Sequence, residues 1–593
     1  MTGSPANTVW ARSLLDELAR AGLREVIVAP GSRSTPLVMA AAADDRLRVR
    51  VHLDERSCGF FALGVGKATA RPAAVITTSG TAVANLYPSV VEASQAGVPL
   101  IVLSADRPHR LRGADANQAI DQVRIFGTYP RAFFELAEPT LDGRALGHLR
   151  GLAARAWASS CGHGAGPVHI NVPFDKPLEP EEPSVDVRTE HLIAVGGRPD
   201  NAPIVRVEAA RPSATDKQLQ ELIGRMAPRS GVIVAGPTEE AGCLGPEVRR
   251  FAAATGFPLL ADPLSGARFG PETGVLTVAA YDLFLRDEAV RSKLVPEFVV
   301  RIGASPTSAG LQRWLFQHAD VPQLVIDDGP RWKDHGGTAE TYLTADPAQT
   351  LGRLADAWPS TEVSGTKAPD ASVSPWARAD AATRDVLARL GDTELGEGSI
   401  AASALRGLPD GGAMVVSSSL PIRDVDAFAV PSSAGVLLFG SRGASGIDGV
   451  VSTAFGIASQ HHSGPTALVI GDVAFLHDQN GLLWSREPDT PLVIVLVDND
   501  GGAIFGMLPI AEYEPEFTTY FTTPHGIDPS YAAAAHRIAY DDVTIEGVEA
   551  AVSSAFAAEK TTIIHVRTDG AEGHRLRAAA RNEVVLRVLD ALG

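Results

Sequence analysis

Residues 471–502 read GDVAFLHDQNGLLWSREPDTPLVIVLVDNDGG, and this stretch decides the fold. The short apolar runs 466–470 and 491–497, which are rich in β-branched residues, predict two buried parallel strands with one helix between them. Asp472 follows the first run and Asn499 follows the second. Because a crossover helix brings the carboxyl ends of adjacent parallel strands to one edge of a sheet, we expect these two side chains to lie side by side.

The residue types at this edge predict a site for a hard cation. The Asp472 carboxylate, the Asn499 amide and the bared carbonyl of the turn at Gly501 are oxygen ligands of low total charge. Such ligands suit Mg²⁺ whose remaining positions are filled by phosphate and water, so the site favours a diphosphate. The alternative is that Gly471-Asp472 only begins a helix, as its N-cap.

Composition argues against several classes of protein. Lys and Arg total 52 against 70 Asp and Glu, a formal net charge of −18, which disfavours nucleic acid or an anionic membrane as a partner. The cysteines Cys58, Cys161 and Cys243 are odd in number and form no CxxC pair, as in a reduced cytosolic protein. No apolar stretch approaches the length of a membrane span, and the N-terminus lacks a signal-peptide pattern. We therefore expect a cytoplasmic protein with no membrane segment.

The segment 73–106 repeats the order of the deciding stretch. Both contain a strand, a glycine turn, a helix, a proline, an apolar strand and an Asp, so the pattern predicts two copies of one α/β unit. The first copy has Ser79-Gly80-Thr81 where the second has Gly471-Asp472. Only the second copy can therefore supply the carboxylate for the metal.

The sequence predicts three α/β domains, each built on a doubly wound parallel sheet. Stretches rich in Pro, Ser and charge at 177–216 and 358–377 are interpreted as linkers. They separate domains at 1–180, 200–357 and 378–593. The middle domain shows strands at 231–235, 298–302 and 323–327 but no evident catalytic cluster.

The deciding stretch resembles the signature of thiamine diphosphate-dependent enzymes: Gly-Asp, a long spacer, then Asn. The resemblance implies that Asp472, Asn499 and the Gly501 carbonyl hold Mg²⁺ or Mn²⁺ on the cofactor's diphosphate. It also makes 1–180 the pyrimidine-binding domain and 378–593 the diphosphate-binding domain. Ser79, Gly80 and Gly471 then belong to the cofactor-binding turns.

Thiamine diphosphate chemistry needs a carboxylate against the aminopyrimidine ring, and Glu55 is the candidate. It lies at a strand-to-helix corner in the copy without the metal ligands. A glutamate at such a position, taken alone, is more often a carboxylate that begins a helix and complements its dipole. In this superfamily the two halves of one site come from different subunits, so the resemblance implies a homodimer or homotetramer with its active sites at the subunit interface.

Four arginines suggest substrates with several carboxylates. Arg33, Arg107 and Arg423 each follow a predicted strand, and Arg442 lies in the Gly-rich turn 440–446. Ligands of open α/β sheets bind at the carboxyl ends of strands, where arginine forks match carboxylates. Each arginine alone can instead form a surface salt bridge. Ser32, Gln118 and Ser419 lie in the same loops and can add neutral hydrogen bonds.

Taken together, the loops resemble the 2-succinyl-5-enolpyruvyl-6-hydroxy-3-cyclohexene-1-carboxylate synthase family of bacterial menaquinone biosynthesis. The segments that carry the resemblance are PGSRSTPL (30–37), LDER (53–56), TSGTAVANLYPSVVEA (78–93), SADRP (104–108), ANQAIDQ (116–122), SRGASGIDG (441–449), GDVAFLHDQNGLL (471–483) and DNDGGAIFGMLP (498–509). They span both outer domains.

The resemblance implies a transferase that decarboxylates 2-oxoglutarate and adds the resulting succinic semialdehyde carbanion equivalent to isochorismate. Glu55 then activates the cofactor. The substrates are faced by the polar set Ser32, Arg33, Arg107, Gln118, Ser419, Arg423 and Arg442. Ile447 and Phe505 are placed near the cofactor and the bound substrate, although Ile447 can also be an ordinary core residue.

The chain departs from this family in the middle domain, where 303–310, GASPTSAG, has no Lys or Arg. Two other interpretations stay open. One is a thiamine diphosphate enzyme acting on a monocarboxylate 2-oxoacid, which would need fewer arginines. The other is a cofactor-binding regulatory protein without turnover.

Overall fold

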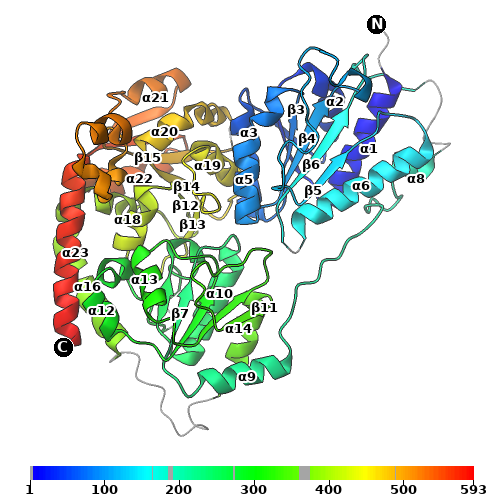
Figure 1. The fold of residues 1–593 in the computed structure, drawn as a ribbon. Helices are drawn as coiled ribbons and strands as arrows, with labels where there is room; N and C mark the ends of the chain where they lie inside the picture. The colour runs from blue at the N-terminus through cyan, green and yellow to red at the C-terminus, as the bar shows by residue number, and fades with distance from the viewer. Residues whose placement is uncertain (1–3, 163, 184–190, 272–273, 360–373, 488) are drawn as a thin grey trace. The chain divides into compact units, whose positions relative to one another are not determined.

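The structure is a computed structural model, and it describes residues 4–162, 164–183, 191–271, 274–359, 374–487 and 489–593 (Figure 1). The chain forms two compact units. Unit 1 takes residues 1–210 together with 441–460 and 478–490, and unit 2 takes 211–440, 461–477 and 491–593. Among the described residues, no helix combines the length and the apolar character needed to cross a membrane.

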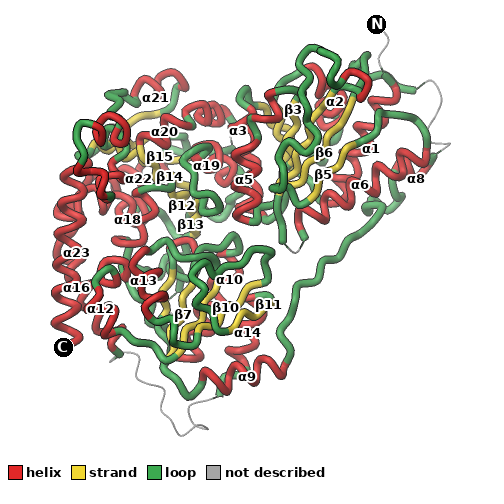
Figure 2. Tube along the Cα trace, in the orientation of Figure 1, coloured by secondary structure: helices red, strands yellow, loops and turns green. Residues whose placement is uncertain are grey.

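Three parallel sheets, drawn in yellow in Figure 2, organise the described part of the chain. The sheet of unit 1 runs, in spatial order, β2 (Arg48–Val51), β1 (Glu25–Val28), β3 (Ala74–Thr77), β4 (Leu100–Asp106), β6 (Pro167–Pro173) and β5 (Ala132–Glu135). The first sheet of unit 2 runs β11 (Thr341–Thr344), β10 (Gln323–Asp327), β9 (Phe298–Ile302), β7 (Gly231–Ala235) and β8 (Leu259–Ala261). Its second sheet runs β13 (Leu437–Gly440), β12 (Ala413–Val416), β14 (Thr466–Gly471), β15 (Leu492–Asp498), β17 (Thr562–Arg567) and β16 (Ala539–Asp542).

The outer sheets share one topology. Numbered from its own first strand, each of the two six-stranded sheets has the order 2-1-3-4-6-5. Strands β3 and β4 therefore take the positions that β14 and β15 take in the other sheet. This finding confirms the prediction of two copies of one α/β unit, with 78–81 at the position of 471–472.

Helices cover both faces of these sheets, as in a doubly wound fold. In unit 1 the helices are α1 (Pro5–Ala21), α2 (Thr35–Ala42), α3 (Glu55–Thr69), α4 (Thr81–Ala84), α5 (Tyr87–Ala96), α6 (Gly143–Cys161), α8 (Leu192–Gly196) and α19 (Val450–Ala458). In the middle domain they are α9 (Asp216–Met226), α10 (Ala241–Thr255), α11 (Tyr281–Leu285), α12 (Glu288–Lys293), α13 (Ala309–Gln317) and α14 (Pro347–Asp356). The last part of unit 2 adds α16 (Pro375–Leu395), α17 (Ile400–Arg406), α18 (Leu420–Phe428), α20 (Asp472–His477), α21 (Ser530–His536), α22 (Val548–Ala557) and α23 (Gly570–Leu592).

One apolar core of unit 1 lies between its sheet and helices α1 and α6, where Leu14 and Leu149 are almost fully buried. Helix α3 packs against α5 and α19. The α3–α19 crossing is so close that a Cβ at Gly64 would lie 2.2 Å from the Thr453 carbonyl oxygen. Glycine is required there because any side chain would push the two helices apart.

The prediction of one helix between Asp472 and Asn499 is wrong. The chain forms the short helix α20, breaks at Asp478 and continues as the 3-10 helix Gln479–Arg486. Asp478 is fully buried, and its Oδ2 accepts a hydrogen bond of 2.7 Å from the Ser452 amide in the first turn of α19. The break lets Asp478 cap a helix that is distant in sequence, which the local pattern did not show.

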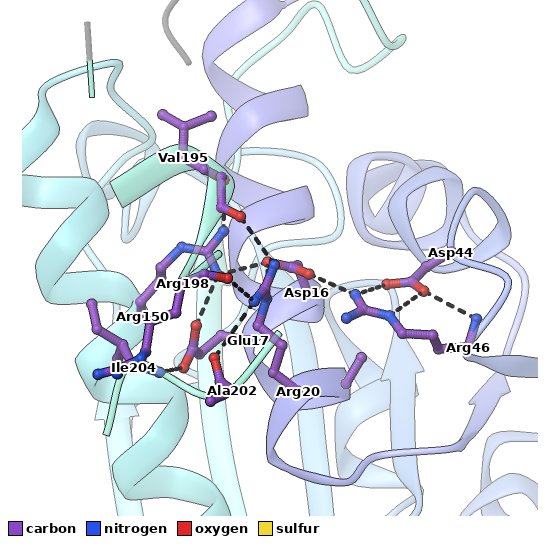
Figure 3. A network of polar contacts seen from close by, with 12 residues as sticks. Asp16, Glu17, Arg20, Asp44, Arg46, Arg150, Val195, Arg198, Ala202 and Ile204 are labelled. Carbon is purple, nitrogen blue, oxygen red and sulfur yellow. Dashed lines mark hydrogen bonds and ion pairs between the residues drawn. The ribbon is translucent and has the colours of Figure 1, made fainter. Parts of the chain in front are cut away.

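The interpretation of 177–216 as a linker is incomplete. Residues 184–190 lie outside the described residues, but 192–196 form α8 and 192–204 are bound to α1 and α6 (Figure 3). Arg150 of α6 is fully buried, donates to the carbonyls of Ala194 (2.8 Å) and Val195 (2.6 Å), and pairs with buried Glu17 at 2.8 Å. Glu17 also accepts from the Ile204 amide.

Of the second predicted linker, 360–373 lie outside the described residues, and α16 begins at Pro375, before the predicted end of the linker. Strands at 231–235, 298–302 and 323–327 are confirmed at the predicted bounds.

Candidate active site

The predicted metal ligands lie at the carboxyl ends of neighbouring strands in unit 2. Strands β14 and β15 are parallel, with Gly471 paired to Val497, so Asp472 and Asn499 each follow a strand end at the same edge. A Cβ at Gly471 would meet no other atom within 4 Å, so the backbone is open there. The prediction that the two residues lie at one edge is confirmed.

Asp472 is a buried carboxylate held by backbone amides. Its Oδ1 accepts from the Val473 amide at 2.7 Å, and its Oδ2 accepts from the Gly501 amide at 2.8 Å. Burial raises the pKa of Asp472 to about 6, and the two amide hydrogen bonds oppose that rise. A divalent cation at this position would favour the ionised form.

Asn499 presents an oxygen that the protein leaves unsatisfied. Its Oδ1 is buried and accepts no hydrogen bond from the described residues, while its Nδ2 donates to both oxygens of Glu397 at 3.3 Å. A buried polar atom without a partner costs free energy unless a ligand or water satisfies it. The Asn499 oxygen is therefore an available metal ligand.

The turn after β15 depends on glycine. Asp500 and Gly501 have φ values of 57° and 141°, and a Cβ at Gly501 would lie 2.2 Å from the Thr522 carbonyl oxygen. The Gly502 amide donates to that same oxygen at 2.7 Å. The close packing of 518–526 against this turn explains why Gly501 has to be glycine.

Two further groups at this edge were missed from the sequence. One ligand atom each of Asp472, Asp498 and His525 lie within 4.8 Å of one another. His525 Nε2 is 3.4 Å from Asp472 Oδ2, and Asp498 Oδ2 is 2.9 Å from His565 Nε2. His525 lies far along the chain in a loop without any metal-ligand spacing, so no local signal identified it.

In unit 1, Glu55 begins α3 at the corner after β2, as predicted. The Asp54 side chain caps this helix by accepting from the Arg56 amide at 2.9 Å. Glu55 is half-buried, and its Oε2 accepts from Asn85 Nδ2 at 3.4 Å. Asn85 is a neighbour that the sequence did not indicate.

Ser79, Gly80, Arg107 and Gln118 come together at the carboxyl edge of the unit 1 sheet. Arg107 Nη1 donates to Ser79 Oγ, and Gln118 Nε2 donates to the Ser79 carbonyl at 2.8 Å. Gly80 has a φ of 86°, and its amide donates to Gln122 Oε1 at 2.9 Å. Gln122 was missed, although it lies within the quoted segment 116–122.

Arg33 joins this group from the loop after β1. Its Nη1 donates to the Phe174 carbonyl at 2.8 Å, and Ser32 precedes it in the same short 3-10 helix. Burial lowers the pKa of Arg33, and the nearby Arg107 charge lowers it further. Two buried guanidinium groups close enough to repel one another would both be stabilised by an anionic ligand.

The Gly-rich turn after β13 is fixed by Glu92 of α5. Glu92 is buried, and its two oxygens accept from the amides of Gly443 (3.0 Å) and Ala444 (2.6 Å). A cavity of about 200 Å³ opens beside the turn, lined by Phe60, Pro88, Val91, Glu92, Ser441, Ala444, Gly446 and Asp448. Arg442 and Ile447 are half-buried in the same turn, and Ile447 is outside the described apolar clusters.

Ser419, Arg423 and Phe505 lie in unit 2. Ser419 has a φ of 75° and precedes α18, where Arg423 Nη1 donates back to the Ser419 carbonyl at 2.5 Å. Phe505 is 37% exposed, and its ring centroid is 5.8 Å from that of Phe521. The predicted residues thus form one set within unit 1 and a second set within unit 2.

Three family descriptions match the chain in succession. "Thiamine pyrophosphate enzyme, N-terminal TPP binding domain" matches residues 9–125, "Middle domain of thiamine pyrophosphate" matches 200–416, and "Thiamine pyrophosphate enzyme, C-terminal TPP binding domain" matches 432–566. The 2-succinyl-5-enolpyruvyl-6-hydroxy-3-cyclohexene-1-carboxylate synthase of Halobacterium salinarum is 43% identical over 98% of this chain and 99% of its own length.

The chain belongs to this synthase family of thiamine pyrophosphate enzymes.

Solved structures show the same fold in more distant members of the superfamily. Benzoylformate decarboxylase from Polynucleobacter necessarius has a TM-score of 0.67 at 16% identity, covering 96% of this chain and 99% of its own. A putative thiamin diphosphate-dependent enzyme from Mycobacterium smegmatis has a TM-score of 0.69 at 19% identity, covering 95% and 99%. The predicted fold class and thiamine diphosphate as cofactor are confirmed.

The described residues fit a divalent cation bound to the cofactor's diphosphate. This synthase offers a buried carboxylate at Asp472, an unsatisfied amide oxygen at Asn499 and open backbone at Gly471. Oxygen donors of this kind match Mg²⁺ and Mn²⁺ rather than a thiolate-bound metal.

Proposed function

We propose that this enzyme decarboxylates 2-oxoglutarate and joins the remaining four-carbon unit to isochorismate, which gives 2-succinyl-5-enolpyruvyl-6-hydroxy-3-cyclohexene-1-carboxylate and CO₂ in menaquinone biosynthesis. The observation that carries the proposal is the group of buried arginines at the strand ends of unit 1. Arg33 and Arg107 lie there in a chain with a net charge of −18, and both proposed substrates are dianions. The full-length similarity to synthases of this name supports it.

Metal binding is assigned to unit 2. Asp472, Asn499 and the Gly501 carbonyl would hold Mg²⁺ or Mn²⁺ on the diphosphate of the cofactor. The unsatisfied Asn499 Oδ1 and the buried Asp472 carboxylate support this assignment, because each gains from a cation. Gly471, Ile447 and Phe505 are proposed to contact the cofactor.

Glu55 is proposed as the catalytic carboxylate. Thiamine diphosphate, when bound, supplies a carbon nucleophile and an electron sink for decarboxylation and carbon–carbon bond formation. Glu55 would hold and move the proton at the aminopyrimidine ring, with Asn85 Nδ2 at 3.4 Å orienting its carboxylate. Ser79 and Gly80 would line the same half of the site.

Substrate binding is assigned to groups whose charge and donors match carboxylates. The proposed set is Ser32, Arg33, Arg107, Gln118, Ser419, Arg423 and Arg442. Arginine forks donate paired hydrogen bonds to carboxylates. Ser79 Oγ accepts from Arg107 and would hold it in place for this role, while Gln118 donates to the Ser79 carbonyl. Within 303–310 of the middle domain there is no Lys or Arg to contribute.

The oligomeric state and the cellular location are also proposed. The enzyme is expected to act as a homodimer or homotetramer whose active sites lie at the subunit interface. A cytoplasmic location is expected from the reduced cysteines and the small-molecule substrates.

The proposal is tested by isochorismate consumption with purified protein, thiamine diphosphate and Mg²⁺. We expect consumption that requires 2-oxoglutarate and fails with pyruvate, because a monocarboxylate leaves one cationic subsite unpaired. Glu55→Gln should retain cofactor binding and lose most of the rate. Release of CO₂ from pyruvate without isochorismate consumption would instead support an enzyme of a monocarboxylate 2-oxoacid. Normal turnover by Glu55→Gln would refute the role of Glu55.

A further inference from the structure

We propose that Glu397 is a positioning residue for the metal site, acting through Asn499. This inference rests on the proposed function only in treating Asn499 as a metal ligand. Glu397 lies in the short 3-10 helix Gly396–Ser399, about a hundred residues before Asn499, and no motif singled it out.

The contact between the two residues decides which end of the amide faces the metal site. Asn499 Nδ2 lies 3.3 Å from both Glu397 Oε1 and Oε2, and Asn499 Oδ1 is buried without a partner among the described residues. An asparagine side chain can rotate to exchange its oxygen and its nitrogen with little change of shape. Only one of the two orientations presents an oxygen to a cation.

Within the described part of the chain, each hydrogen-bond partner of Glu397 is a donor, so Glu397 selects the orientation that points Asn499 Nδ2 toward it. Arg577 Nη2 donates to its Oε1 at 2.9 Å, and Thr568 Oγ1 donates to its Oε2 at 2.7 Å. With the Asn499 amide flipped, oxygen would face oxygen at Glu397, and an NH₂ group would face the cation. Both contacts would be repulsive, so the acceptor character of Glu397 keeps Oδ1 on the metal side.

The position of Glu397 is itself fixed. Its side chain is 2% exposed, and Arg577 of α23 binds Asp424 of α18 through two nitrogens at 2.8 and 2.6 Å. Asp424 lies beside Arg423, which is proposed to bind substrate. A carboxylate held by a buried guanidinium can orient a ligand without moving, as outer groups do in other metal sites.

Metal affinity measures this role directly. Binding of Mn²⁺ to the full-length protein is followed by electron paramagnetic resonance of free Mn²⁺, with saturating thiamine diphosphate. We expect Glu397→Gln to weaken Mn²⁺ binding by about ten- to a hundredfold, because a glutamine NH₂ no longer excludes the flipped Asn499 amide. Thr568→Val is the matched control. It removes one hydrogen bond from Glu397, leaves both acceptors toward Asn499, and should weaken binding much less.

A reciprocal exchange separates positioning from mere support of the fold. Asn499→Asp should bind Mn²⁺ poorly, because it places a carboxylate against Glu397. The double variant Asn499→Asp with Glu397→Gln should recover Mn²⁺ binding. The glutamine NH₂ then donates to one oxygen of the carboxylate at position 499, and the second oxygen of that carboxylate stays available to the metal. A purely structural role for Glu397 predicts no such recovery.

The possible outcomes are distinct. If Glu397→Gln lowers the melting temperature of the metal-free protein but binds Mn²⁺ as the unaltered protein does, the positioning role is refuted. The same holds if Asn499→Ala weakens binding and neither Glu397→Gln nor the double variant changes it as expected. If the unaltered protein binds no Mn²⁺ with thiamine diphosphate, the metal site of the proposed function fails instead, and the inference falls with it.

Discussion

Single side chains in this enzyme acquire their properties from residues that are distant in sequence. Asp478 sits in a polar stretch, yet it is buried where it caps α19 through Ser452. Burial raises the pKa of Asp478 to about 7. Glu397 owes its proposed role to Asn499 in the same way, and Arg107 is held by Ser79.

The raised pKa of Asp478 predicts a pH-dependent stability. Its folded pKa lies above its ordinary value of 3.8, so the native state binds the extra proton. The contribution of Asp478 is therefore fully present below about pH 4 and is lost as pH rises through 7. Asp478→Asn is neutral throughout and keeps an acceptor for Ser452. The melting temperature of this variant should gain on that of the unaltered protein between pH 5 and pH 8; parallel pH profiles would contradict the prediction.

At the scale of elements, buried ion pairs and backbone contacts attach segments that look independent in the sequence. Residues 192–204 contain two glycines and two prolines and look like a linker. Arg150 and Arg20 nevertheless bind carbonyl groups of this segment (Figure 3), and Arg20 Nη2 donates to the Gly196 carbonyl at 3.0 Å. The network joins α1, α6 and α8 within unit 1.

Arg150→Met should therefore destabilise unit 1. The change leaves Glu17, which is fully buried, without its 2.8 Å partner, and such losses cost about 3–5 kcal/mol. Urea unfolding followed by fluorescence, together with proteolysis within 191–210, measures the effect. Arg46→Met is the matched control. Arg46 and Arg150 both pair with Asp16, but the Arg46 side chain is 37% exposed. Its loss should cost below about 1 kcal/mol. Equal effects of the two changes would argue against the assigned role of burial.

At the scale of the whole molecule, two sheets of the same topology carry different parts of the proposed site. The shared strand order places 78–81 and 471–472 at equivalent positions, but only the latter offers a carboxylate. Glu55, the arginine pair and the Gly-rich turn lie in unit 1, and the proposed metal ligands lie in unit 2. The resemblance to the superfamily implies that one site takes its halves from two subunits.

Mixed oligomers test that division. Glu55→Gln and Asp472→Ala should each be nearly inactive alone, because each removes one half of every site. When the two proteins exchange subunits, half of the dimers become mixed, and each mixed dimer contains one unaltered site, so about a quarter of the normal activity should return. Activity is measured before and after mixing, and sedimentation gives the oligomeric state. If mixing restores no activity after proven exchange, the two halves come from one subunit.

Much of the fold was predictable because local patterns determine it. Apolar β-branched runs bounded by Gly, Pro or Asp predict strands without reference to the rest of the chain, and those at 231–235 and 298–302 are confirmed. The repeated order of strand, turn and helix predicted two related units, and the shared topology confirms it. The positions of Asp472 and Asn499 followed from parallel pairing alone.

The tertiary structure alone decided the contacts between residues far apart in the chain. It broke the predicted helix at Asp478 and bound 192–204 to α1 and α6. It also brought Glu397 to Asn499 and His525 to Asp472. Side-chain hydrogen bonds and burial depend on which elements pack together, and composition and spacing do not encode that partner choice. By itself, the sequence determined where these strands form and that two α/β units repeat. It also determined that the proposed metal ligands are oxygen donors. The environment of each ligand, and therefore its charge and orientation, depends on packing.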